Sequence, residues 1–110
     1  MTTLTIKIGS SFAVPIQFYD TETKLGMAIT DDMVITAQIV NAHNEVIAIP
    51  NITTYPDQVN DAGFILFEVP ALITKSWKAG SAQFDIKLTI GENVRHSNTI
   101  QFQIIKSITP

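Results

Sequence analysis

Residue types that could support catalysis or metal binding are few in this chain and widely spaced. There is no cysteine, and the two histidines, His43 and His96, have no carboxylate or second histidine at the spacing of a metal site. Nucleophilic catalysis would depend on Ser, Thr or Lys, and no serine lies in a glycine-flanked elbow. The sequence therefore predicts no enzyme active site, no metal and no cofactor.

Acidic residues occur in three short pairs, which we considered as calcium ligands or catalytic carboxylates. The pairs are Asp20 with Glu22, Asp31 with Asp32, and Asp57 with Asp61. A calcium loop needs several oxygen ligands at regular positions and a closing Glu, which none of these segments supplies. Because Asp is favoured in turns, where it accepts backbone hydrogen bonds, we expect turns at these positions.

Three aromatic side chains carry polar groups suited to a partner surface or a sugar: Tyr19, Tyr55 and Trp77. Trp77 follows a short apolar segment and precedes Gly80, so we expect it to pack at one end of a hydrophobic core. Tyr19 and Tyr55 fall in predicted loops, which often carry binding residues. Together with Asn44, in a predicted turn, they are the predicted surface-contact residues.

Charge and composition narrow the class of protein further. The net charge is -3, charged residues make up 15% of the chain and the basic residues are scattered, which argues against a nucleic-acid partner. A hydrophobic content of 45% is incompatible with intrinsic disorder. No basic, apolar leader or long apolar run is present, so we expect no signal peptide, no membrane partner and synthesis in the cytoplasm.

The elements that must position these residues are β-strands. The chain contains 17 Ile, 13 Thr and 7 Val, and branching at Cβ favours strands over helices. About seven or eight short alternating segments, separated by turn residues, predict a single all-β domain over residues 1–110. We expect a two-sheet antiparallel immunoglobulin-like sandwich with one short helical connector over residues 70–77, and a barrel is the alternative.

Two strands carry signals of their position in a sheet. Pro15 lies in an alternating segment, and because proline cannot donate to a strand ladder it predicts an edge strand or a bulge. Residues 64–69 are interpreted as a strand with apolar side chains on both faces, interrupted only by Glu68. This pattern predicts a central strand that is covered on both faces.

The last two strands have the clearest alternation, with even-numbered residues facing inward. The inward set is Ala82, Phe84, Ile86, Leu88, Ile90, Ile100, Phe102 and Ile104. A three-residue loop, Gly91-Glu92-Asn93, would keep these faces matched and pair Phe84 with Ile100 and Ala82 with Phe102. The same register points polar residues inward near the start of the last strand, so we expect a bulge or an exposed strand end at residues 95–98.

Short segments distributed along nearly the whole chain resemble a known group of proteins. They are Ile6-Lys7-Ile8-Gly9-Ser10-Ser11, Ile35-Thr36-Ala37-Gln38-Ile39, Trp77-Lys78-Ala79-Gly80, Phe84-Asp85-Ile86, Gly91, Ser97-Asn98-Thr99-Ile100 and Ile108-Thr109. With these the chain resembles small immunoglobulin-like proteins encoded among the tail, baseplate and fibre genes of tailed bacteriophages and prophages. The resemblance implies framework roles for Trp77, Gly80, Asp85 and Gly91, and it transfers no catalytic residue.

What the resemblance implies about function is a non-enzymatic virion structural protein, made in the bacterial host cytoplasm. Such a protein would act through contacts with copies of itself, as a homo-oligomer, or with other virion proteins. The alternative is a receptor- or carbohydrate-binding module at a phage tail tip. In that case Tyr19, Asn44 and Tyr55 would contact a host-surface glycan.

Overall fold

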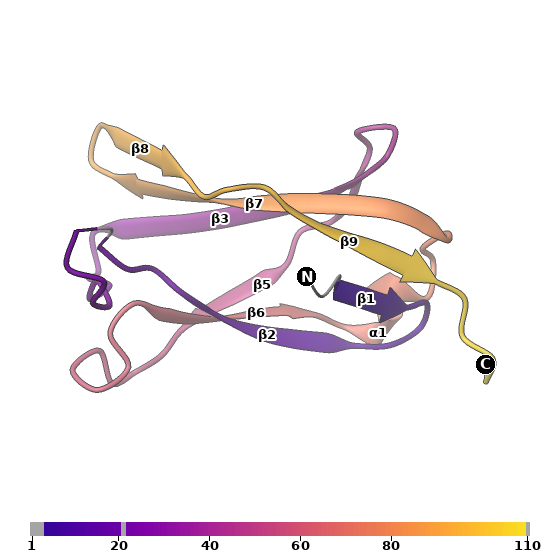
Figure 1. Ribbon diagram of the computed structural model, residues 1–110, viewed down its shortest axis with the longest axis horizontal. Helices are drawn as coiled ribbons and strands as arrows, with labels where there is room; N and C mark the ends of the chain where they lie inside the picture. Colours follow the sequence, from indigo (N-terminus) through magenta and orange to yellow (C-terminus); the bar gives the residue numbers. More distant parts are fainter. Residues whose placement is uncertain (1–3, 21, 110) are drawn as a thin grey trace.

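The computed structural model describes residues 4–20 and 22–109, and these form two β-sheets that face each other (Figure 1). Among these residues, the large sheet has the order β1 (Leu4–Lys7), β9 (Ile100–Ile105), β7 (Gly80–Ile90), β3 (Met33–Asn41) and β4 (Val46–Ala48), with β8 (Asn93–His96) paired to β7. The small sheet has the order β2 (Phe12–Gln17), β6 (Phe64–Val69) and β5 (Asn51–Thr54). The predicted two-sheet all-β architecture is confirmed.

The strand order is that of an immunoglobulin-like sandwich. The neighbours β9, β7 and β3 correspond to strands G, F and C, and β2, β6 and β5 correspond to B, E and D. One pairing departs from the predicted antiparallel pattern, because β1 runs parallel to β9. The chain leaves β1 for the opposite sheet instead of turning back in a hairpin, so β1 and β9 point to the same end (Figure 1).

The core lies between the sheets and is built from the alternating residues. Phe84 and Ile86 are 4% and 1% exposed, whereas Lys87 is exposed, as the alternation predicts. The ring of Phe84 in the large sheet stacks on Phe67 in the small sheet, with centroids 4.5 Å apart. Aromatic packing of this kind adds to the hydrophobic burial that holds the two sheets together. The buried cluster consists of Ile6, Ala37, Ile39, Ala48, Ile65, Phe67, Val69, Trp77, Ala82, Phe84, Ile86, Phe102 and Ile104.

The edge position that Pro15 predicts is confirmed, since β2 is an outer strand of the small sheet. The backbone N–H of Phe18 donates to the Gly63 carbonyl at 2.8 Å, on the β6 side of the chain. Alternation along the strand therefore points the nitrogen of Pro15 away from β6, where no ladder bond is lost.

β6 is the central strand of the small sheet, as predicted, but the prediction that it is covered on both faces is wrong. Ile65, Phe67 and Val69 are buried against the large sheet, but Phe64 and Leu66 are half-buried on the outer face, over which no described element lies. These outward side chains are shielded by neighbours on the same face. The ring of Tyr55 lies beside Phe64, with centroids 5.6 Å apart.

The short helical connector is confirmed as α1 (Ala71–Thr74), which joins the two sheets at one end of the sandwich (Figure 1). Pro70 is its N-cap, one position before the predicted one. Trp77 follows it and is 6% exposed, and its indole N–H donates to the Ile47 carbonyl at 3.0 Å. The predicted packing of Trp77 at an end of the core is therefore confirmed.

The last hairpin confirms the predicted strand pairing but not the predicted loop. Phe84 pairs with Ile100 and Ala82 with Phe102 as expected, whereas Ile90 pairs with Asn93, which leaves a two-residue loop. Gly91, with φ 57°, provides the positive φ that such tight hairpins require.

The two-residue loop alone would turn the odd-numbered residues of the last strand inward. A bulge between β8 and β9 turns the even-numbered residues of β9 inward again. Lys87 pairs with His96, and the next pair along the strands is Phe84 with Ile100. Two residues of β7 lie between these pairs, but three residues lie between them on the partner strand. Ser97 fills the gap, because its N–H donates to the Ile86 carbonyl at 2.8 Å and its Oγ accepts from the Ile86 N–H at 2.9 Å. The predicted bulge is confirmed, and it divides the predicted last strand into two.

Candidate binding surfaces

Two long loops and the tight hairpin turn between β7 and β8 lie at the same end of the sandwich, which we call the loop end (Figure 1). Residues 18–20 and 22–32 belong to one long loop, and residues 55–63 form the other. The Gln58 Oε1 atom accepts hydrogen bonds from the N–H groups of Ile29 and Gly63, both at 2.9 Å, so one side chain ties the loops together. In antibody variable domains the loops at one such end form the binding site.

Two of the predicted contact residues lie at the loop end. Tyr19 is 54% exposed and forms an isolated bridge with Gly26. Tyr55 is half-buried against Phe64, so only part of its ring is available to a partner.

The acidic residues of the loop end form turns, as the sequence predicts. Asp20 Oδ1 accepts from the N–H groups of Thr23 and Glu22, and these bonds hold the pKa of Asp20 below its usual value. For Asp57, the side-chain amide of Asn60 and then backbone N–H groups lower the pKa of the carboxyl in the same way. Within residues 4–20 and 22–109, no group of three or more His, Cys, Asp or Glu side chains is placed to hold a metal ion.

Asn44, the third predicted contact residue, lies at the opposite end of the sandwich, in the turn between β3 and β4. Its φ of 62° places it in the left-handed region, which Asn tolerates better than most residues. Asn41 holds this turn, because its Oδ1 accepts from the N–H groups of His43 at 2.9 Å and Glu45 at 3.0 Å. The three predicted residues therefore do not form one site.

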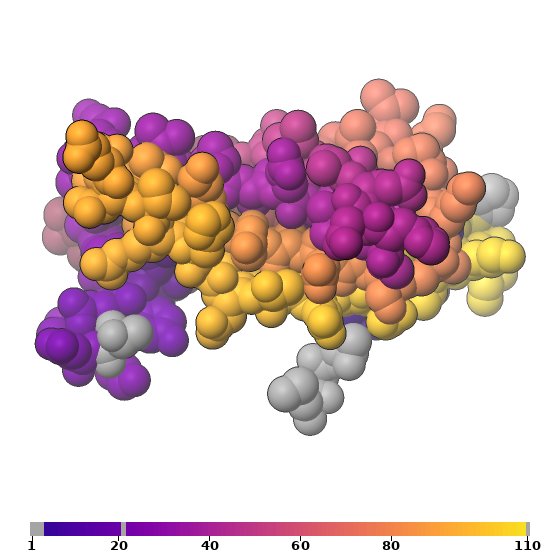
Figure 2. Space-filling model, turned by 90° about the horizontal axis from the view of Figure 1, so that it is seen from above, coloured from indigo at the N-terminus to yellow at the C-terminus, as the bar shows by residue number. Residues whose placement is uncertain are grey.

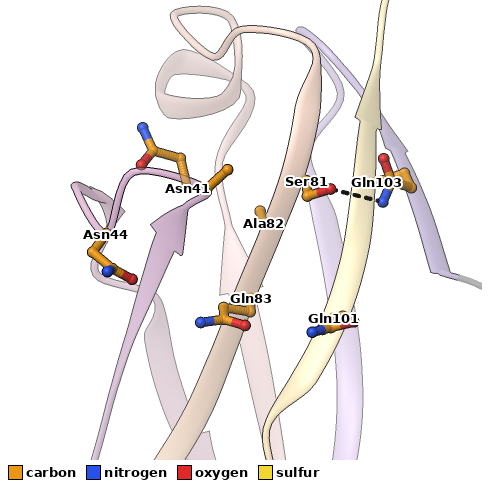
Figure 3. Close-up of a pocket in the computed structure, with 8 residues that line it drawn as sticks. Asn41, Asn44, Ser81, Ala82, Gln83, Gln101 and Gln103 are labelled. Atoms are coloured by element: carbon orange, nitrogen blue, oxygen red, sulfur yellow. Dashed lines mark hydrogen bonds between the residues drawn. The ribbon is translucent and has the colours of Figure 1, made fainter.

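Beside Asn44, the outer face of the large sheet contains a shallow hollow of about 180 Å³, which we call the amide hollow (Figure 3). Figure 2 shows this face, with the β3–β4 turn in magenta standing beside β7 in orange and β9 in yellow. The lining residues carry amide, hydroxyl or methyl groups, and none of them is charged. They are Asn41, Ala42, Asn44, Ser81, Ala82, Gln83, Gln101 and Gln103.

Strand register fixes the positions of the side chains in the amide hollow. Gln83 pairs with Gln101 and Ser81 with Gln103 on neighbouring strands, so their side chains project from the same face. The Nε2 atom of Gln103 donates to the Ser81 Oγ at 3.1 Å. The amides of Gln83 and Gln101 have no hydrogen-bond partner among the described residues, and they can therefore both donate to and accept from a ligand.

Sequence reasoning identified Asn44 but missed the glutamines of the amide hollow. A signal was present, because the predicted pairing of Phe84 with Ile100 also sets Gln83 opposite Gln101 on the solvent face. What the alternation could not show is that the β3–β4 turn rises beside these strands and makes the surface concave.

A larger hollow of about 580 Å³ adjoins the first around the β3–β4 turn and shares Asn41, Ala42 and Ser81 with it. It lies between that turn and the segment that connects α1 to β7. In contrast to the amide hollow, it includes ionisable side chains, those of His43, Glu45 and Lys78, together with Trp77.

The outer face of the small sheet is the third candidate surface, and we call it the small-sheet face. Register and alternation place on it Ala13, Pro15, Gln17, Asn51, Thr53, Phe64, Leu66 and Glu68. Glu68 is the one ionisable residue among these. By contrast, the outer face of the large sheet carries Lys7, Asp85 and Lys87.

Comparison with known proteins gave no match: no protein-family model and no curated protein matches the chain. In the described part of the chain, no helix is long and apolar enough to span a membrane.

Proposed function

We propose that the protein is a non-enzymatic structural protein of a tailed-bacteriophage virion, associated with the tail, baseplate or fibre. It acts through protein–protein contacts, with copies of itself or with other virion proteins. The sequence resemblance supports the phage assignment. The observation that supports action by contact is the small-sheet face, which is half apolar and has one ionisable residue, Glu68.

The composition of the small-sheet face suits burial against another protein. Leu66 lies near its centre on β6, with Pro15 beside it on β2, and Phe64 begins the same strand at the loop end. The cores of protein interfaces are depleted in charged residues and enriched in aromatic ones, because burying an unpaired charge is costly. Glu68 sits at one end of β6, so a partner can cover the rest of the face without burying a charge.

The experiment introduces a charge at the centre of this face. Leu66→Lys should dissociate the oligomer or the complex, because a buried ammonium group would have no partner there. Thr36→Lys is the matched control, since Thr36 is exposed on the outer face of the large sheet. Light scattering coupled to sizing gives the mass of each variant, and circular dichroism confirms that both remain folded.

The expected result is an assembly in the wild type and in Thr36→Lys, and a monomer in Leu66→Lys. Mass spectrometry of purified phage particles tests the location, and the protein should be present in them. A wild-type protein that is monomeric at all concentrations and absent from particles would refute the proposal.

A further inference from the structure

We infer that the amide hollow is a binding site for a neutral carbohydrate. Side chains from the β3–β4 turn, β7 and β9 line one concave surface, and Figure 3 shows Asn44, Gln83 and Gln101 from these three segments beside one another. This assignment is independent of the proposed virion contact, which uses the opposite sheet. It also differs from the sequence-based alternative, because of the three residues named there only Asn44 lines the hollow.

The chemistry of the lining selects the class of ligand. Each amide presents an acceptor oxygen and a donor NH₂ group side by side, and each sugar hydroxyl can both donate and accept. Gln83 and Gln101 sit opposite each other in register, so their amides can bond neighbouring hydroxyls of one sugar ring. Because no lining residue is charged, the hollow lacks the charge-assisted donors that recognise phosphate or carboxylate groups.

The location of the hollow argues against an extended peptide as its ligand. Peptides that add to a sheet bond to the free backbone groups of an edge strand. Here β7 lies between β3 and β9, and β9 lies between β7 and β1 along the bonded stretch. The floor of the hollow therefore offers side chains, not free backbone, to a ligand.

Several of the polar groups are held in place before any ligand arrives. The Ser81 hydroxyl fixes the amide of Gln103, and Gln83 is half-buried in the centre of the sheet. The turn that carries Asn44 is held by Asn41, whose carbonyl also accepts from the Asn44 N–H at 3.0 Å. Such ordering lowers the entropic cost of binding.

The size of the hollow indicates how much of a glycan it contacts. Its volume of about 180 Å³ is below the roughly 300–1,000 Å³ of typical small-molecule pockets. A longer chain can continue around the β3–β4 turn into the adjoining hollow, which shares Asn41, Ala42 and Ser81. With no aromatic residue in the lining, affinity for one site is low, and repeated copies of the protein would raise it through avidity.

The test begins with an array of neutral and acidic oligosaccharides, probed with the protein displayed in many copies. The best neutral ligand is then titrated into the isotope-labelled Leu66→Lys variant, whose substitution lies on the opposite sheet, and the titration is followed by NMR. We expect the side-chain NH₂ signals of Gln83 and Gln101 to shift, together with the backbone signals of the β3–β4 turn. Because this titration needs no assembly, its outcome is separate from that of the virion proposal.

Substitutions then locate the site. Gln83→Ala and Gln101→Ala should each weaken binding about threefold to tenfold, as expected for the loss of one or two neutral hydrogen bonds. Asn44→Gly removes an amide but keeps the positive φ of the turn, and it should weaken binding to a similar extent. The matched control is Gln38→Ala, because Gln38 is exposed on β3 outside the hollow and should bind like the wild type.

Three results would overturn the assignment. One is the absence of binding to every neutral glycan on the array. Another is equal loss of binding in Gln38→Ala and Gln83→Ala. The third is binding restricted to acidic glycans and abolished by Lys78→Gln, which would place the ligand in the adjoining hollow.

Discussion

Thr74 is the one polar residue that is buried among the described residues, with 0% of its surface exposed. It ends α1, and its hydroxyl donates to the Ser10 carbonyl at 2.9 Å, with a longer contact of 3.3 Å to the Ala71 carbonyl. Ser10 belongs to the turn between β1 and β2. This hydroxyl therefore ties the β1–β2 turn to the helical connector, 64 residues further along the chain.

Replacing Thr74 by valine removes the hydroxyl and keeps nearly the same shape. A hydrogen bond of this kind contributes about 0.5–1.5 kcal/mol net. Ser10 is exposed, so water can solvate its carbonyl in the variant and limit the extra penalty. We therefore expect Thr74→Val to lower the free energy of unfolding by about 1 to 1.5 kcal/mol.

Two further variants separate the hydroxyl from the methyl group. Thr74→Ser keeps the hydroxyl and loses a buried methyl, at a cost of about 1 kcal/mol. Thr74→Ala loses both groups, and its cost should be close to the sum of the other two, about 2 to 2.5 kcal/mol.

Urea unfolding measures all three, with fluorescence of the single tryptophan, Trp77, as the probe. Trp77 is buried in the folded protein, so its emission should move to longer wavelength on unfolding. If Thr74→Val is as stable as the wild type while Thr74→Ala costs no more than Thr74→Ser, the hydroxyl contributes nothing and the reasoning is wrong.

Three other variants test the bulge, a loop glycine and a turn carboxylate. Ser97→Ala removes the acceptor of the buried Ile86 N–H, so urea unfolding should show a loss of about 1–2 kcal/mol. Gly63→Ala would place its Cβ against a backbone carbonyl oxygen at φ +83° and should cost at least about 3 kcal/mol, whereas Gly9→Ala, at φ +88° in open space, should cost about 1–2 kcal/mol in thermal unfolding. The pKa of Asp57 in the folded protein lies below the ordinary value of 3.8. The stabilisation by its ionised carboxyl is therefore present above pH 3.8 and is lost as the pH falls through the lowered pKa. In an acid titration followed by NMR, the amide shifts of this loop should report that loss, and Asp57→Ala should abolish the step.

Alternation of side chains was sufficient to predict much of the fold. It gave the inward positions of Phe84 and Ile86 and the pairing of Phe84 with Ile100. Proline chemistry gave the edge position of β2, and turn chemistry explained the acidic pairs. These features follow from the sequence because each depends on a residue and its immediate neighbours in one strand or turn.

The loop of the last hairpin and the outer face of β6 were predicted incorrectly for a shared reason. Even-numbered residues can face inward in both strands with a three-residue loop, or with a two-residue loop followed by a bulge. The structure has the second arrangement, in which Ser97 forms the bulge through its hydrogen bonds with Ile86. Likewise, an apolar residue such as Phe64 can be covered by another layer of the protein or shielded by a neighbouring ring such as that of Tyr55, and the sequence pattern is the same in both cases. In both cases the deciding contact comes from another strand.

The sequence by itself determined which residues of the clearest strands face the core, which strand lies at an edge, and that the chain is an all-β domain, because these depend on local alternation and backbone chemistry. Only the tertiary structure decided that Tyr19 and Tyr55 lie at one end and Asn44 at the other. It also brought Asn44 beside Gln83 and Gln101. Residues far apart in a chain become neighbours through strand order and register, and these are set by how whole sheets pack.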